Sequence, residues 1–308
     1  MMPSSTVSNL PETLLQQLAT AVLDKDRALR LVIAALLGEG HVLLEDLPGV
    51  GKTTLALALS RSLGLDFVRV QMTSDLLPGD ILGGTVFDPN ARQFVFRPGP
   101  IFHSVILVDE INRASPRAQS ALLEAMAEGQ VSLDGQTYSL PDPFFVIATQ
   151  NPMEHQGVFP LPESQLDRFS VILSLGYPSA AAEARLLAGE LTPVEALAPV
   201  VDVATVKAWR QSVAQVFLSA EIRQMLLDLA HRSRADGRIR LGLSPRGLLA
   251  LRRMAQSWAF LAGRDFIEPG DLRAVTVPVL AHRLLLREPG SSAQMAAALM
   301  QECWGFGP

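Results

Sequence analysis

Cysteine, lysine and long apolar runs are scarce in this sequence of 308 residues. The one cysteine, Cys303, cannot form an internal disulfide, and no cluster of cysteines offers a metal site, so we expect a reducing, cytoplasmic environment. No run approaches the roughly 18 uninterrupted apolar residues that a membrane-spanning helix requires. The first ten residues also lack the basic start and apolar run of a signal peptide. The sequence therefore predicts a soluble protein without a membrane span.

Charge is distributed unevenly along the chain. The formal net charge is −5, but residues 1–178 hold 11 Lys and Arg against 19 Asp and Glu, whereas residues 179–308 hold 15 against 12. The length and the 48% hydrophobic content predict about two compact domains. The acidic balance argues against a dedicated nucleic-acid binder, which usually concentrates basic residues on one surface.

Short apolar runs alternate with helical patterns through the first 178 residues. The runs of strand length lie at residues 41–45, 67–71, 105–108, 144–149 and 171–175. Because each run is almost unbroken, the pattern indicates an α/β fold with a parallel five-stranded sheet covered by helices on both faces, an αβα core. Two segments interrupt the alternation: residues 75–100, rich in glycine and proline, and residues 130–140, where Asp134-Gly135 suits a two-residue hairpin turn.

The strand signals stop after residue 178. Helical patterns follow at about residues 205–217, 219–235, 245–262 and 271–287. We therefore expect residues 1–178 to form the αβα core and residues 179–308 to form a smaller, all-helical domain.

A glycine-rich segment follows the first predicted strand. Residues 46–54 read Asp-Leu-Pro-Gly-Val-Gly-Lys-Thr-Thr and lead into a helix, which is the P-loop arrangement. In a P-loop, backbone N–H groups surround nucleotide phosphates at a helix N-terminus, while Lys52 adds positive charge and the Thr53 hydroxyl can bind Mg²⁺. The candidate nucleotide-binding residues are Pro48, Gly49, Val50, Gly51, Lys52, Thr53 and Thr54. A turn without a ligand is the alternative, but a chain with three lysines gives little scope for a chance Gly-Lys-Thr.

Polar residues end two further strands. Asp109 and Glu110 follow the run at 105–108, where Asp109 can hold Mg²⁺ and Glu110 can polarise an attacking water. Asn151 follows the run at 144–149 and can orient that water or a γ-phosphate. The alternatives are a solvated strand end for the two acids and a turn before Pro152 for Asn151.

Two arginines can supply positive charge to a phosphate. Ser244-Pro245-Arg246 reads as the N-cap, first and second residues of a helix, which fixes Arg246 at a helix start in the second segment. Arg168, shortly before the last predicted strand, is the second candidate. Phosphoryl transfer uses an arginine of this kind from a lid or a neighbouring subunit. A surface ion pair is the alternative for both residues.

Taken together, these segments resemble the MoxR family of AAA+ ATPases. The resemblance extends from about residue 22 to about residue 285, and its motifs follow in order at residues 42–54, 75–81, 99–102, 109–114, 121–126, 148–152, 161–169 and 244–246. It implies an AAA+ P-loop core with a helical lid, and a homo-oligomeric ring, usually a hexamer, with ATP and Mg²⁺ at the subunit junctions.

The same resemblance assigns roles residue by residue: Walker A to Lys52 and Thr53, Walker B to Asp109 and Glu110, sensor 1 to Asn151, the arginine finger to Arg168, and sensor 2 to Arg246. The finger would act on the ATP of a neighbouring subunit, which Arg113 is also expected to face. Residues 75–98 correspond to an insertion in the second helix, and residues 128–140 to the hairpin before sensor 1.

The resemblance also suggests partners and shows two departures. Family members typically work beside proteins with a von Willebrand factor type A domain, as chaperone-like ATPases that mature or activate enzyme complexes. The client is not identified by the sequence. Asp46 stands where Walker A usually has glycine, and Asp24-Lys25 replaces a Gly-Gln pair near the adenine pocket.

Two other functions are carried as alternatives. Residues 223–253 contain eight arginines and two acidic residues, which leaves a nucleic-acid remodelling ATPase as one alternative. This run is better explained as a lid face that meets phosphates and neighbouring subunits. Asp46 keeps in view a nucleotide-gated scaffold with little hydrolysis.

Overall fold

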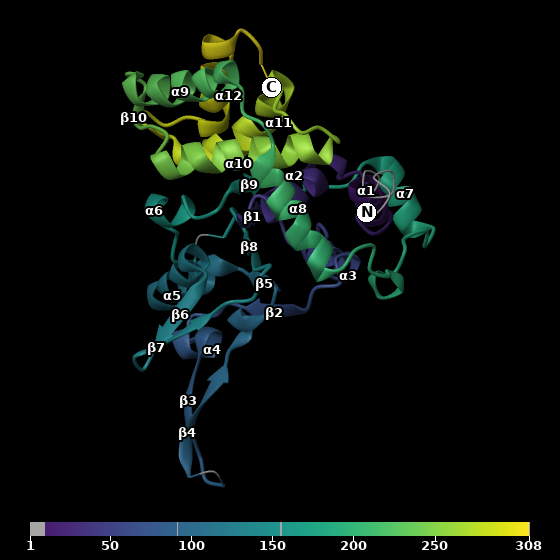
Figure 1. Ribbon diagram of the computed structural model, residues 1–308, viewed down its shortest axis with the longest axis vertical. Coiled ribbons are helices and arrows are strands. Elements are labelled where there is room, and N and C mark those ends of the chain that lie inside the picture. Colours follow the sequence, from purple (N-terminus) through teal and green to yellow (C-terminus); the bar gives the residue numbers. More distant parts are fainter. Residues whose placement is uncertain (1–9, 91, 155, 308) are drawn as a thin grey trace.

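The computed structural model describes residues 10–90, 92–154 and 156–307. Its centre is a sheet of five strands, β1 (Val42–Glu45), β2 (Phe67–Gln71), β5 (Val105–Asp109), β8 (Phe145–Gln150) and β9 (Val171–Leu173) (Figure 1). The strand order is β2-β5-β8-β1-β9, and every pairing is parallel. The predicted parallel five-stranded sheet is confirmed.

Alternate residues of the central strands enter two separate apolar clusters. On β5, Val105 and Leu107 belong to the cluster on one face of the sheet, and Ile106 and Val108 belong to the cluster on the other. The helices that cover the first face are α1 (Leu10–Ala21), α2 (Asp26–Leu37) and α3 (Lys52–Ser62), and the helix that covers the second is α5 (Pro116–Glu128). Burial of both faces is why the strands are unbroken apolar runs.

Local sequence signals fix the ends of α5. The Ser115 hydroxyl accepts a hydrogen bond from Ala118 N (3.4 Å), Pro116 occupies the first helical position, and Gly129 ends the helix at a φ of +64°. Serine before proline at a helix start and a left-handed glycine at its end are the residues that these positions favour.

The part of the chain after β9 is mainly helical, as predicted. Its helices are α7 (Ala180–Leu187), α8 (Val203–Gln215), α9 (Ala220–Ala235), α10 (Pro245–Leu261), α11 (Pro269–Leu280) and α12 (Ser292–Trp304). The expectation that it is all helical needs correction, because β10 (Ile239–Leu241) and β11 (Leu285–Leu286) form an antiparallel pair. Strands this short show no recognisable periodicity, and the helix predicted to reach residue 287 ends at Leu280, two residues after Pro278.

The helical segment and the sheet share one apolar cluster. Helix α2 packs against α8 and α10, and residues of all three helices join residues of β1 and β9 in that cluster. The domain boundary at residue 178 therefore stays a prediction. Within the described ranges, no helix is both long and apolar enough to cross a membrane.

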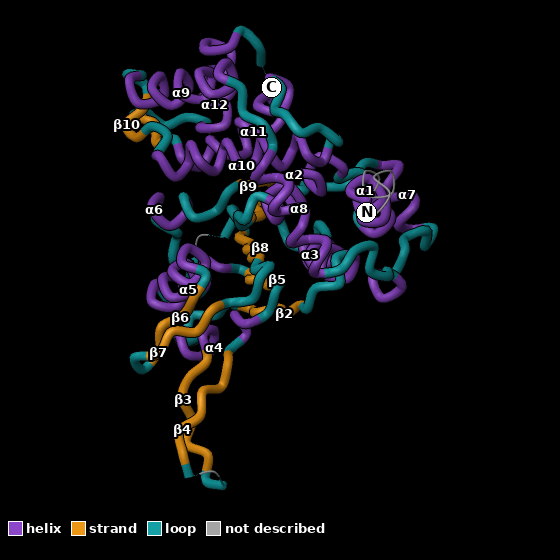
Figure 2. Tube along the Cα trace, viewed as in Figure 1, coloured by secondary structure: helices purple, strands orange, loops and turns teal. Residues whose placement is uncertain are grey.

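Both interruptions of the alternating pattern contain a hairpin, which the sequence indicated for residues 130–140. Between β2 and β5 lie α4 (Pro78–Leu82), β3 (Gly83–Asp88) and β4 (Gln93–Pro98), and this hairpin projects from the molecule (Figure 2). The second hairpin, β6 (Gln130–Leu133) and β7 (Gln136–Ser139), turns at Asp134-Gly135, both with positive φ. It holds the base of the first hairpin, because Tyr138 stacks on Phe96 at 4.0 Å.

His41, directly before β1, is a buried histidine that joins two elements. Its Nδ1 accepts a hydrogen bond from Val146 N (3.1 Å), so Nε2 carries the proton and donates to Met126 O (3.2 Å). Burial lowers the pKa of His41 from 6.5 to about 4. Because the unfolded chain then binds this proton more readily, the free energy of unfolding should fall by about 3 kcal/mol between pH 6.5 and pH 4 through this residue.

Urea unfolding at several pH values across this interval measures the effect of His41. A His41→Gln variant should be less stable than the parent protein at neutral pH. Its free energy of unfolding should also decrease less as the pH is lowered. Equal pH dependence in the variant and the parent protein would contradict the assignment.

Candidate functional site

The polar segments singled out in the sequence meet at one edge of the sheet. Strand β8 lies between β1 and β5, so Asn151 follows the central strand, the P-loop follows one neighbour, and Asp109 ends the other. Two hydrogen bonds join the three strand ends: Asp46 N donates to Gln150 O (3.2 Å), and Glu110 N donates to Thr149 Oγ1 (2.9 Å). The carboxyl edge of a parallel sheet is where α/β proteins place their ligands.

The P-loop has the backbone that phosphate binding requires. Gly49 and Gly51 have φ of +84° and +96°, and a side chain at either position would meet nothing within 4 Å. Backbone conformation, and not lack of space, is therefore what requires glycine here. Among the described residues no side chain caps α3, so its first N–H groups remain free to donate to an anion.

Lys52, the first residue of α3, is folded back onto its own loop. Its Nζ donates to Asp46 O (2.8 Å) and Leu47 O (3.0 Å). A phosphate oxygen offers a charged acceptor in place of these two neutral carbonyls, so the ammonium group is well placed to turn toward a ligand.

Asp46 has a structural role that accounts for its departure from the usual glycine. It is buried, and its carboxylate accepts hydrogen bonds from Ser174 Oγ (2.6 Å), Leu175 N (2.5 Å) and Gly176 N (3.0 Å). These bonds join the start of the P-loop to the chain after β9. Glycine could make none of them.

Replacing Asp46 with glycine should therefore destabilise the protein although it restores the usual motif. We expect a loss of about 3 kcal/mol in the free energy of unfolding, since charged hydrogen bonds are removed and two backbone amides lose their acceptor. Asp46→Asn keeps one acceptor oxygen and should lose less. Denaturant unfolding of both variants measures this, and an Asp46→Gly variant as stable as the parent would refute it.

Asp109 and Glu110 are each held by side chains of neighbouring strands. Thr149 Oγ1 donates to Asp109 Oδ1 (2.6 Å), and Arg69 Nη2 pairs with Asp109 Oδ2 at 2.5 Å. Gln71 Nε2 donates to Glu110 Oε2 (2.8 Å). Glu110 itself has φ +56° and ψ +53°, a strained conformation for a residue with a side chain, and such strain clusters at functional sites.

Arg69, Gln71 and Thr149 contact the site but were not predicted from the sequence. A signal for two of them was present, because Arg69 and Gln71 alternate on a strand otherwise made of apolar residues and so share a face. The neighbour of that strand could not be read from the sequence. In the structure Gln71 lies opposite Asp109 in the register of β2 and β5.

Arg113 and Asn151 make contacts within this chain. Arg113, expected to face a neighbouring subunit, pairs with Glu110 (3.0 Å) and Glu154 (2.7 Å). Asn151 is mostly buried, and its Oδ1 accepts from Met153 N (3.1 Å), so the turn considered as an alternative does form. None of the described residues accepts a hydrogen bond from its amide group, which leaves that group free for a ligand.

A cavity of about 440 Å³ lies beside the segment after β9 that binds Asp46. It is formed by the turn between α1 and α2, by β9 and by α11, and its wall includes Ser174 and Leu175, the partners of Asp46. Its size suits a nucleotide base. Asp24 and Lys25, which the family resemblance places near the adenine pocket, both line this cavity. Lys25 Nζ donates a hydrogen bond to Tyr177 O (2.8 Å).

The donor set also fits Mg²⁺ bound together with a nucleotide. No group of three or more metal-ligating side chains occurs in the ranges that the structure covers. Mg²⁺ in nucleotide sites needs no such group, because phosphates and water supply most of its ligands. The Thr53 hydroxyl and the Asp109 carboxylate are the protein ligands that this site can offer.

Arg168 and Arg246 lie away from the P-loop. Arg168 comes shortly before β9, so it lies at the amino-terminal edge of the sheet. Arg246 lies near the same edge, because Ser244, two residues before it, donates to Oδ2 of Asp167 (3.0 Å), the neighbour of Arg168 in the chain. The P-loop is at the opposite edge, since β1 and β9 are parallel neighbours. The Ser244-Pro245-Arg246 helix start has the predicted form, with Ser244 Oγ accepting from Gly247 N (2.9 Å). Arg168 Nε and Nη1 are buried and find no acceptor among the described residues.

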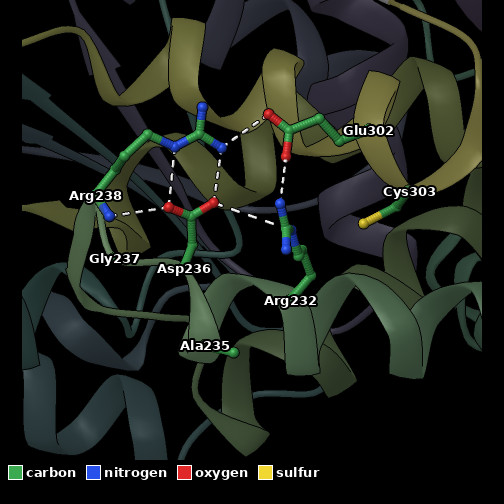
Figure 3. Close-up of a pocket in the computed structure, with 7 residues that line it drawn as sticks. All are labelled: Arg232, Ala235, Asp236, Gly237, Arg238, Glu302 and Cys303. Carbon is green, nitrogen blue, oxygen red and sulfur yellow. Dashed lines mark hydrogen bonds and ion pairs between the residues drawn. The ribbon is translucent and has the colours of Figure 1, made fainter.

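The arginine run of residues 223–253 is partly neutralised within the chain. At a cavity of about 640 Å³ between α9 and α12, Arg238 pairs with Asp236 (2.7 Å) and Glu302 (2.8 Å), and Arg232 pairs with Glu302 (3.0 Å) (Figure 3). Arg232 and Arg238 thus join α12 to the end of α9, and the expectation that this run meets phosphates and neighbouring subunits stays a prediction. The cysteine at this cavity, Cys303, has a pKa raised by burial, which lowers the share of its nucleophilic thiolate form.

The fold and the site define a class: a P-loop αβα core followed by a helical segment, as in AAA+ ATPases. Comparison with known proteins agrees. Residues 41–171 match the model of the ATPase family associated with various cellular activities (AAA), and residues 231–303 match the AAA lid domain.

Relatives identify the family within that class. The uncharacterized protein YeaC of Bacillus subtilis is 45% identical over 275 residues, which cover 88% of this chain and 86% of YeaC. Chaperone MoxR1 of Mycobacterium tuberculosis is 36% identical (86% and 73% covered), and protein MoxR of Methylorubrum extorquens is 35% identical (88% and 86%). This chain belongs to the MoxR family of AAA+ ATPases. The crystal structure of a candidate ATPase from Cytophaga hutchinsonii matches with a TM-score of 0.87 at 31% identity, covering 96% of this chain and 94% of that one.

Proposed function

We propose that this protein hydrolyses ATP to ADP and phosphate, with Mg²⁺, at the carboxyl edge of its sheet. The observation that carries the proposal is the meeting of three strand ends there: the P-loop, Asp109 with Glu110, and Asn151. A binding module needs the first of these alone. The second and third are the parts that position and activate a water.

Each residue has a distinct part in this proposal. The N–H groups of residues 49–54 and the Lys52 ammonium hold the phosphates. Mg²⁺, when bound, neutralises the negative charge that develops on the phosphate oxygens. Glu110 accepts a proton from the attacking water, and the free amide of Asn151 orients that water or the γ-phosphate. Arg69, paired with Asp109 at 2.5 Å, would compete with Mg²⁺ for that carboxylate.

We also propose that Arg168 and Arg246 serve the ATP of a neighbouring subunit. Both lie at the edge opposite the P-loop of their own chain, so a head-to-tail ring is the arrangement that brings them to a nucleotide. Arg168 as a whole is only partly buried, so the exposed part of its side chain can reach that nucleotide. A hexamer is the ring size expected from the family.

Mixing two inactive variants tests this proposal. Glu110→Gln and Arg168→Ala subunits should each hydrolyse ATP poorly alone. In a one-to-one mixture, an Arg168→Ala subunit keeps Glu110 and can receive Arg168 from its neighbour, so about a quarter of the sites should regain activity in a head-to-tail ring. Phosphate release measures this.

The same mixing with Arg246→Ala in place of Arg168→Ala tests Arg246. Recovery in the mixture places Arg246 on a neighbour's nucleotide, and absence of recovery places it on its own. Full turnover by Arg168→Ala alone, or no recovery when it is mixed with Glu110→Gln, would refute the role of Arg168.

We further propose that turnover drives a chaperone-like maturation or activation of a partner protein, since a relative of this chain is named chaperone MoxR1. A partner with a von Willebrand factor type A domain is the expectation from the family. The projecting hairpin, with Phe87 and Phe94 exposed near its end, is a candidate contact. Capture by the Glu110→Gln protein loaded with ATP tests this, and recovery of nucleic acid alone would contradict it.

A further inference from the structure

A buried arginine, Arg283, joins the segment that carries Arg168 to the C-terminal helices through hydrogen bonds. It lies in η5 (Ala281–Arg283), directly after α11, and only 6% of it is exposed. Its Nε donates to Asp167 Oδ1 (2.7 Å). Its Nη groups donate to four backbone carbonyls, those of Ser170 (3.1 Å), Val279 (2.5 Å), Asp167 (3.2 Å) and Phe169 (2.6 Å). All five N–H donors of the guanidinium are thereby used.

The second oxygen of Asp167 reaches the helix that carries Arg246. Ser244 Oγ donates to Asp167 Oδ2 (3.0 Å), and Ser244 is the N-cap of α10. Arg246 is the second residue of this helix. Burial lowers the pKa of Arg283, and the positive charge of Arg246 is close enough to lower that pKa further. One carboxylate thus joins η5 to the start of α10, and it directly precedes Arg168 in the chain.

Gly247 shows how closely these elements approach. A Cβ at this position would lie 2.6 Å from Arg283 Cδ and 2.9 Å from Arg283 Nε. The helix can therefore pack over the Arg283 side chain only because the residue after Arg246 is glycine. The start of α10 thus packs directly against the Arg283 side chain.

We propose that Asp167 and Arg283 are positioning residues that hold Arg168 and Arg246 as one unit, so that both arginines reach the phosphates of one nucleotide together. The proposal rests on the function proposed above. A carboxylate with two bonded oxygens and an arginine with five bonded N–H groups leave little freedom between the two arginines. Catalytic groups must be held closely, since a misplacement of about 1 Å can cost about 100-fold in rate.

Asp167→Asn tests the proposal with little change of shape. The variant removes the negative charge that faces buried Arg283 while keeping an oxygen for its Nε. We expect kcat for ATP to fall about tenfold, with KM nearly unchanged, because the arginines act mainly on the transition state. Ser244→Gly is a second variant, since glycine is an acceptable N-cap and the substitution removes the hydroxyl bonded to Asp167.

Asp271→Asn is the matched control. Asp271 is a buried carboxylate that is also bonded to an arginine, Arg264 (2.8 Å), and it lies in the first turn of α11, at the end remote from η5. The change should cost comparable stability and leave kcat as it is. Thermal unfolding of both variants establishes that the comparison is fair.

A double substitution separates positioning from general destabilisation. If Asp167 acts through Arg168, Asp167→Asn should cause a smaller loss of kcat in an Arg168→Ala background than in the parent protein. Equal losses in the two backgrounds, or a kcat no lower than that of Asp271→Asn, would overturn the positioning role while leaving the proposed function standing. Unchanged kcat in Arg168→Ala alone would overturn both.

Discussion

Glu110→Gln is expected to reduce ATP turnover about 100-fold or more while the protein still binds ATP. Glu110 directly follows Asp109, the last residue of β5, and its carboxylate already accepts a hydrogen bond from Gln71 Nε2 (2.8 Å) and pairs with Arg113 (3.0 Å). Glutamine keeps the size and an acceptor oxygen but cannot take a proton from water. Steady-state phosphate release and the binding of a fluorescent ATP analogue measure the two properties separately.

Glu124→Gln is the control for this variant. Glu124 is exposed on α5, so the same change of charge there should leave both turnover and binding unaltered. Turnover by Glu110→Gln close to that of the parent protein would refute the role of Glu110 as the proton acceptor.

Lys52→Ala should weaken ATP binding about 10- to 100-fold, because a charged hydrogen bond to a phosphate contributes about 1.5–3 kcal/mol. The fold should survive, since Lys52 Nζ donates only to two part-buried carbonyls of its own loop. Isothermal titration with ATP, with and without Mg²⁺, measures the loss.

Lys207→Ala provides the comparison for Lys52→Ala. Lys207 is one of the three lysines, and its only described ion pair is exposed, with Asp142 at 3.3 Å, so its loss should change ATP affinity little. ATP affinity reduced equally in both variants would show that net charge, and not the P-loop ammonium, controls binding.

The sequence predicted most of the sheet because its strands are buried on both faces. Runs such as 105–108 had to be apolar without interruption, and polar residues at their ends marked the site edge. The P-loop was predictable because phosphate binding requires particular residues: glycines where φ is positive, and a lysine that supplies positive charge. The hairpin of β6 and β7 was predictable from its turn residues, Asp134-Gly135.

Features that depend on long-range contacts could not be predicted. The structural role of Asp46 could not be predicted, because its hydrogen-bond partners, Ser174 to Gly176, lie more than 120 residues further along the chain. Arg69 reads as one exposed residue of a strand until the strand order places it against Asp109. The strands β10 and β11 are too short to give a recognisable pattern. The position of the helix start that carries Arg246 depends on the contact of Ser244 with Asp167, which belongs to a distant segment of the chain.

The nucleotide that remains bound after incubation with Mg²⁺ and ATP tests the central claim most directly. The account predicts that the parent protein, rapidly separated from free nucleotide, carries ADP and has released phosphate, whereas Glu110→Gln carries intact ATP. Chromatography of the bound nucleotide distinguishes these results. Intact ATP on the parent protein as well would make it a nucleotide-gated scaffold, and no bound nucleotide on either protein would contradict the site itself.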